Sequence, residues 1–233
     1  MGLLIMTSSR QIVKGALIGI GARLSPTVLS RLTSILNYLY TGRWMKEHNF
    51  KAPVRVNDRM QLIETIAKPI AEQEVLYLEF GVWKGESTRR WSQLLKNKNS
   101  RLHGFDSFEG LPEDWNDEMK SGHFSTRGVP PDIPDGRVKF FVGRFEQTLP
   151  TYQFVDSPVL VIYLDADLYS STAFVLGTLK KHIKVGTIIC CDDFWDRHHE
   201  QRAFNEFLSE TGMTVELIAA DYGMRRVVFR RTK

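Results

Sequence analysis

The chain has 233 residues, which is enough for one α/β domain with a full hydrophobic core and a short extension. Its composition, with 42% hydrophobic and 25% charged residues, is ordinary for a globular protein, and no internal repeat or low-complexity tract is present. The formal net charge of +4 is mild, and no basic face bearing aromatic residues stands out. We therefore expect a slightly basic exterior and no nucleic-acid partner.

The N-terminal segment contains short apolar patches that are interrupted by Arg10, Lys14 and Arg23. This pattern predicts neither a membrane-spanning helix nor a cleaved signal peptide. We favour packing of the segment against its own domain or a second subunit, with an amphipathic helix on a membrane surface as the alternative. Two cysteines, Cys190 and Cys191, are neighbours in a predicted strand and point to opposite faces, so we expect no disulfide and a cytoplasmic location.

Helical spacing of apolar residues predicts helices over 11–23, 26–41 and 59–72. From residue 75 the pattern changes to seven short apolar runs, which we expect to be strands: VLYLEF, RLHGFD, RVKFFVG, VLVIYLD, GTIICCDD, MTVELIAA and RRVVFRR. The first five alternate with helix-like or loop segments, which indicates a parallel sheet covered on both faces, and the last two should form an antiparallel hairpin. We therefore divide the chain into a helical N-terminal extension over 1–73 and an α/β domain over 74–233.

The first predicted strand ends in an acid and a glycine-rich turn, LEFGVWKGEST. Glycines at 81 and 85 permit a sharp turn and the close approach of a ligand, although a tight turn without a ligand explains them equally well. The second strand ends with Asp106, 25 residues after Gly81, where a carboxylate can accept hydrogen bonds from ribose hydroxyls. Together with Glu79, which can bind a cationic amine, Asp106 favours S-adenosylmethionine as the cofactor.

Four carboxylates follow two other predicted strands: Asp165 and Asp167 after VLVIYL, and Asp192 and Asp193 after TIICC. If these strands are neighbours, the acids meet at the carboxyl edge of the sheet, where their like charges repel. A hard divalent cation such as Mg²⁺ takes oxygen ligands and would remove that repulsion. The alternative is separate roles, with Asp192 or Asp193 as a helix cap and Asp167 as a solvated loop residue.

The longest irregular segment, 107–136, is rich in Gly, Pro and Asp, which is typical of a lid or a binding loop. It contains His123, a candidate for a general base, and His198 and His199 are further candidates after the fifth strand. An ordinary surface or helix-start position is nevertheless the favoured interpretation of each of these histidines.

In chain order, LEFGVWKGEST, GFDSFEGLPE, GRFEQTLP, LDADLYSST and CDDF resemble the macrocin O-methyltransferase family. The resemblance runs from residue 75 to the end, while the first 73 residues match only in being helical. It implies a Rossmann-like, seven-stranded class I methyltransferase sheet with a C-terminal antiparallel hairpin, so that 74–233 would be an S-adenosylmethionine-dependent domain. It also implies an enzyme that methylates a sugar hydroxyl with magnesium in a natural-product or polysaccharide pathway, often as a homo-oligomer through N-terminal helices.

The resemblance also implies roles for single residues. Asp165, Asp192 and Asp193 would be the metal ligands, and Asp167 would be the general base. The cofactor contacts would come from Glu79, Gly81, Ser87, Asp106, Ser107, Gly143, Arg144, Phe145 and Asp165. Lys84 and Glu86 stand in the first turn where smaller residues are expected.

Three other functions are compatible with parts of this pattern. A catechol-type O-methyltransferase would use the same acids on a planar diol, and a non-catalytic protein could bind S-adenosylmethionine alone. An RNA methyltransferase would require a basic, aromatic-bearing face. We favour a small-molecule glycoside or sugar as the substrate.

Overall fold

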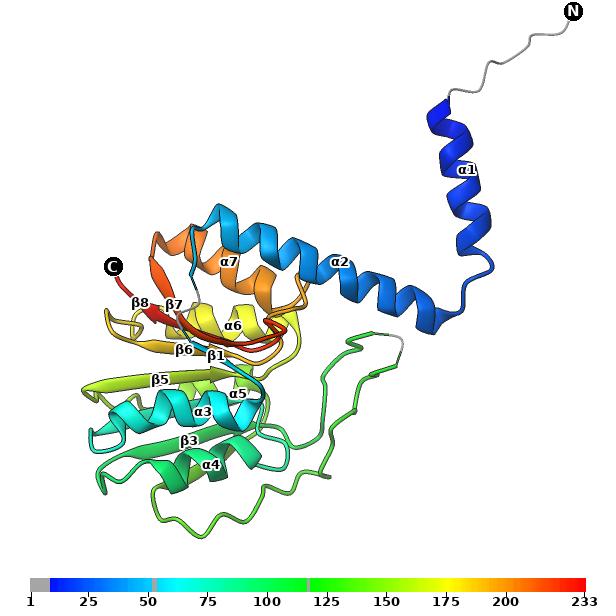
Figure 1. Ribbon diagram of the computed structural model, residues 1–233. Coiled ribbons are helices and arrows are strands. Elements are labelled where there is room, and N and C mark those ends of the chain that lie inside the picture. Colours follow the sequence, from blue (N-terminus) through cyan, green and yellow to red (C-terminus); the bar gives the residue numbers. More distant parts are fainter. Residues whose placement is uncertain (1–8, 52–53, 117) are drawn as a thin grey trace, which may run out of the picture.

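The computed structural model describes residues 9–51, 54–116 and 118–233. Residues 1–8 of the predicted N-terminal extension and residue 117 of the predicted lid lie outside this description. One central sheet carries helices on both faces, and the first helix and the start of the second extend away from it (Figure 1).

The sheet has eight strands in the order β1-β7-β8-β6-β5-β2-β3-β4. They are β1 (Val54–Val56), β2 (Val75–Phe80), β3 (Arg101–Asp106), β4 (Val138–Val142), β5 (Val159–Leu164), β6 (Ile188–Cys191), β7 (Val215–Asp221) and β8 (Val227–Arg231). Strands β2 to β6 pair in parallel, and β8 lies antiparallel between β6 and β7. The predicted parallel sheet and C-terminal hairpin are therefore confirmed.

The helices of the described residues are α1 (Ser9–Gly21), α2 (Pro26–Glu47), α3 (Arg59–Ala67), α4 (Glu86–Leu94), α5 (Phe145–Thr148), α6 (Tyr169–Leu179) and α7 (Glu200–Thr211), with short 3₁₀ turns at Lys68–Ile70 and Leu149–Thr151. Buried residues of α3 and α4 pack on one face of the sheet, and those of α6 and α7 pack on the other. No helix in the part of the chain that the structure describes combines the length and apolar character needed to cross a bilayer.

Strand β2 shows why both faces need helices. Leu78 points to the α6 and α7 layer, and its neighbour Tyr77 points to the α3 and α4 layer, because successive side chains of a strand alternate. Both side chains are fully buried. A strand that is buried at every position, as β2 is, can be stable only between two covering layers.

The elements differ most from prediction in three places. Strand β1 is an added edge strand, which pairs in parallel with β7 but has only three residues and gives no alternating pattern. Helix α2 continues to Glu47 because a single glycine, Gly42, does not end a helix when the residues around it favour the helical conformation. Helix α3 ends earlier, at Ala67, because Pro69 lacks the N–H that the next turn needs.

Candidate active site

The carboxyl edge of the sheet brings the two acidic strand ends together. Strands β5 and β6 are direct neighbours, so the predicted adjacency of these strands is confirmed. The ladder continues past their ends, since Asp165 N donates to Phe80 O at 2.9 Å and Asp192 N donates to Leu164 O at 3.0 Å. These backbone hydrogen bonds fix the positions of Asp165 and Asp192 relative to the ends of the neighbouring strands.

The turn after β2 packs directly against the end of β5. Gly81 has φ +88°, and a side chain on it would overlap the backbone carbonyl of Asp165. Glycine is therefore required here by backbone packing as well as by the left-handed conformation. This close packing leaves the turn facing the space above the acidic strand ends.

A cavity of about 570 Å³ lies at this edge, within the range of small-molecule sites. Ligand crevices of parallel sheets occur at the carboxyl ends of the strands, as here. The predicted site residues that line it are Gly81, Asp106, Ser107, Gly143, Arg144, Phe145, Asp165 and Asp167, together with Asp193. Trp115 and Phe124 of the predicted lid also line it, so described residues of this segment form part of the cavity wall.

Asp106 holds the first turn while it faces the cavity. Its Oδ2 accepts hydrogen bonds from the backbone N–H groups of Val82 and Trp83, both at 2.8 Å, and its Oδ1 accepts one from Phe108 at 2.7 Å. A carboxylate offers about four acceptor positions, so a further donor can still bind. The residue can therefore meet a ribose hydroxyl without releasing the turn.

Four predicted site residues do not line the cavity; Asp192 is described below, and the other three follow here. Glu79 is 1% exposed beneath α4, where it accepts a hydrogen bond from the Thr88 hydroxyl, and burial raises the pKa of Glu79 to about 7. Ser87 is buried in the same helix. His123 is exposed, and its ring packs edge-on against Phe124 at 4.4 Å between centroids.

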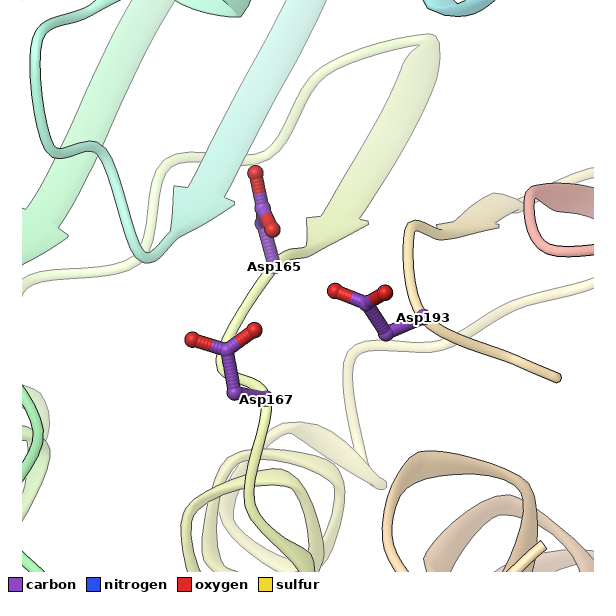
Figure 2. Close-up of side chains that lie close together, drawn as sticks. All are labelled: Asp165, Asp167 and Asp193. Carbon is purple, nitrogen blue, oxygen red and sulfur yellow. The ribbon is translucent and has the colours of Figure 1, made fainter. Parts of the chain in front are cut away.

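Three carboxylates surround one space at the cavity wall. Oxygens of Asp165, Asp167 and Asp193 lie within 4.8 Å of one another (Figure 2). Asp167 has φ +57°, a left-handed conformation that is uncommon for residues with a side chain and is concentrated at functional sites. We refer to these three residues as the acidic cluster.

The acidic cluster is electrostatically unfavourable by itself. Burial, followed by the charge of Asp193, raises the pKa of Asp167 to about 9. Burial and the neighbouring Asp192 also raise the pKa of Asp165 well above its usual range, although Arg59 opposes this. Three oxygen donors of like charge fit a hard divalent cation, which would favour their ionised forms.

Asp192 was predicted as a metal ligand, but its carboxylate belongs to a different group. It is 1% exposed and binds Arg59 Nη2 at 2.5 Å, Tyr163 Oη at 2.8 Å and Arg226 Nε at 3.0 Å. Neighbouring residues after a strand point in opposite directions, so only Asp193 of the pair faces the cavity. The structure thus groups Asp167, and not Asp192, with Asp165 and Asp193.

The residues that hold these acids were not among the predicted site residues. Arg59 starts α3 and lies 3.4 Å from Asp165, although 106 residues separate them in the chain. Arg225 contacts Asp193 Oδ1 at 2.9 Å, and Glu200 accepts a hydrogen bond from the backbone N–H of Asp193 at 3.1 Å. Arg59 and Arg225 carry no local signal because each reaches its acid from a distant segment, and Glu200, seven residues from Asp193, lies outside the strand-end pattern.

Comparison with known proteins gives a consistent result. Residues 78–194, half of the chain, match the family described as "Methyltransferase domain". A tetracenomycin-C derivative 4'-O-methyltransferase from Streptomyces olivaceus, whose name specifies a dimethoxy-rhamnosyl group, is 28% identical over 63% of this chain and 62% of its own. Demethyldecarbamoylnovobiocin O-methyltransferase from Streptomyces niveus is 27% identical over 62% of each chain.

Among solved structures, the O-methyltransferase NovP superposes with a TM-score of 0.60 at 24% identity, covering 75% of this chain and 80% of its own. This likeness supports the fold. The chain spans about 62% of the length of the two curated relatives, and the matched segment holds all three residues of the acidic cluster.

Proposed function

Because the chain belongs to the methyltransferase-domain family, we propose that it transfers a methyl group from S-adenosylmethionine to a sugar hydroxyl with the help of Mg²⁺. One observation carries the proposal: three carboxylates from two strand ends surround one space on the wall of a ligand-sized cavity. Both curated relatives are O-methyltransferases by name, and the name of one specifies a rhamnosyl compound. A glycoside is therefore the acceptor class that we favour.

The cofactor would occupy the side of the cavity next to β2 and β3. Asp106 would accept hydrogen bonds from its ribose hydroxyls, and the turn after Gly81 would lie against its amino-acid part. Gly143, Arg144 and Phe145, at the start of α5, would border the base. Glu79 is buried beneath α4 and does not line the cavity, so it would support the turn from behind.

The acidic cluster would hold the metal ion. When bound, S-adenosylmethionine supplies an activated methyl group, and a divalent cation lowers the pKa of an alcohol beside it. Asp165 and Asp193 would be ligands, and Asp167 would be either a third ligand or the acceptor of the hydroxyl proton. In the transfer, a carbon–oxygen bond forms as the carbon–sulfur bond breaks and the hydroxyl proton leaves.

The segment 107–136 would cover the reacting groups and contact the acceptor. Leu111 and Trp115 pack against Leu168, so the lid rests directly on the loop that follows Asp167. A closed lid excludes water and positions the acceptor hydroxyl. His123 is exposed on this lid and is not part of the acidic cluster, so we do not assign proton transfer to it.

The experiment is a methyl-transfer assay with S-adenosylmethionine, Mg²⁺ and a panel of rhamnosides and other glycosides with vicinal hydroxyls. We expect turnover of at least one glycoside, its loss with EDTA and its recovery with excess Mg²⁺. A phenolic diol serves as the matched control acceptor. Turnover that EDTA leaves unchanged would contradict the metal role, and preferred turnover of the diol would contradict the sugar acceptor.

A further inference from the structure

Helices α1 and α2 expose an unusual amount of apolar surface. None of the 13 residues of α1 is buried, and Figure 1 shows this helix standing clear of the sheet and its layers. Its large apolar side chains are between 55% and 73% exposed: Ile12, Val13, Leu17, Ile18 and Ile20. Contiguous exposed apolar surface of this kind marks an interaction site rather than ordinary exterior.

Helix α2 contacts the domain through its C-terminal half, where Trp44 joins the hydrophobic core. Its buried residues are Asn37, Thr41 and Trp44, and the Trp44 indole donates to Asn205 of α7 at 2.8 Å. The apolar residues lie on another face at helical spacing and are 39% to 67% exposed: Val28, Leu29, Leu32, Ile35, Leu36 and Leu39. The domain already covers the face that holds Asn37, Thr41 and Trp44, so the exposed apolar face is available to a partner outside this chain.

The charge of this region indicates the chemistry of the partner. Residues 1–46 contain six Lys or Arg and no Asp or Glu, whereas residues 47–233 contain 25 and 27. The cations include Arg10 and Lys14 on α1 and Arg31 on α2. Basic side chains beside an apolar helix face are typical of helices that lie on anionic membranes.

The sequence of α1 also requires a stabilising surface. Gly15, Gly19 and Gly21 lower the helix propensity of a segment of only 13 residues, which is marginal in water even with better helix formers. Burial of one apolar face in a bilayer interface would compensate for this. The helix need not cross the bilayer to do so.

We propose that α1 and the outward face of α2 dock on the surface of an anionic lipid bilayer. Their apolar side chains would enter the boundary between headgroups and acyl chains, and their cations would contact lipid phosphates. A second copy of the chain is the competing occupant, as predicted from sequence. Packing α1 and α2 of one copy on those of another would, however, bring together two cationic segments. Residues 1–46 contain no carboxylate that could pair with these cations.

The test is flotation of the full chain with vesicles of phosphatidylcholine and phosphatidylglycerol in equal parts, against vesicles of phosphatidylcholine alone. We expect binding to the anionic vesicles that weakens as salt is raised. Arg10→Gln with Lys14→Gln should weaken binding about 25-fold, because each cation near such a surface contributes about fivefold. Leu17→Glu with Leu39→Glu should abolish it.

Val185→Glu is the matched control, since Val185 is 66% exposed outside these helices and should leave binding unchanged. Each variant should fold, because the changed side chains are exposed. Circular dichroism and methyl-transfer activity would check this. The proposal is overturned if the wild-type chain fails to float with anionic vesicles. In that case, a second copy of the chain would be the occupant if the lipid-free chain sediments as an oligomer and Leu17→Glu with Leu39→Glu converts it to monomers.

Discussion

Asp192 and Asp193 are adjacent in the chain, yet they belong to regions with opposite electrostatics. Behind the strand edge, Asp192 is enclosed by two guanidinium groups and a tyrosine hydroxyl. In front of it, Asp193 shares a space with Asp165 and Asp167, and Arg225 contacts only its Oδ1. The first region is compensated by the protein itself, whereas the second has more negative charge than the protein neutralises.

This contrast separates a structural role from a functional one. A buried acid with its own cations stabilises the position of α3 and β8 and needs no ligand. A cluster of acids whose pKa values are raised is typical of a site that completes its charge with a bound cation. The two regions meet at Arg59, which contacts both Asp192 and Asp165.

The largest effect is expected from the acidic cluster. Asp167→Asn keeps the size of the side chain but removes a carboxylate, so we expect kcat to fall by about 10²–10⁴-fold. Cofactor affinity should change little, which isothermal titration calorimetry can measure. Asp156→Asn is the control, since the Asp156 side chain is 85% exposed and distant from the cluster. Wild-type turnover by Asp167→Asn would remove this residue from the proposed chemistry.

The compensated region should affect stability. Asp192→Ala leaves Arg59 and Arg226 without their buried partner, and we expect a loss of about 3 kcal/mol in the free energy of unfolding. Urea denaturation measures this. Asp156→Ala, which breaks an exposed ion pair with Lys184, should cost at most about 1 kcal/mol. Equal losses for the two variants would show that Asp192 is not held as the structure indicates.

The smallest effect concerns pH and metal binding. The pKa of Asp167 is raised to about 9, so without metal this carboxyl keeps its proton at neutral pH and must release it to bind a cation. Mg²⁺ affinity should therefore rise by about tenfold per pH unit between pH 7 and 8.5 and level off above pH 9. Asp167→Asn should have a weaker dependence. Calorimetric titration across this range would contradict the assignment if wild-type affinity were constant.

The same proton affects stability with a defined sign. The folded pKa of Asp167 lies above its unfolded value, so the metal-free folded protein binds more protons than the unfolded chain between about pH 4 and pH 9. Stability from this group therefore falls as the pH rises through that window. Mg²⁺ should restore it most strongly at the upper end, as a rise in melting temperature.

Much of the site could be predicted from sequence because it depends on strand ends. Apolar runs located all seven strands of the predicted sheet, and their parallel pairing places Asp106, Asp165 and Asp193 at one edge. Edge strand β1 was missed because three residues give no period. The role of Asp192 was not predictable, since it depends on Arg59 and Arg226 from other segments.

The local order of residues determined the strands, the glycine turn at Gly81 and the presence of four acids at two strand ends, because side-chain alternation and backbone sterics act over a few residues. Tertiary structure decided which three acids share a space and which one is neutralised. That choice depends on the direction of each side chain and on cations more than 30 residues away in the chain. Charge compensation is a property of the folded arrangement, and no segment of the chain contains it alone.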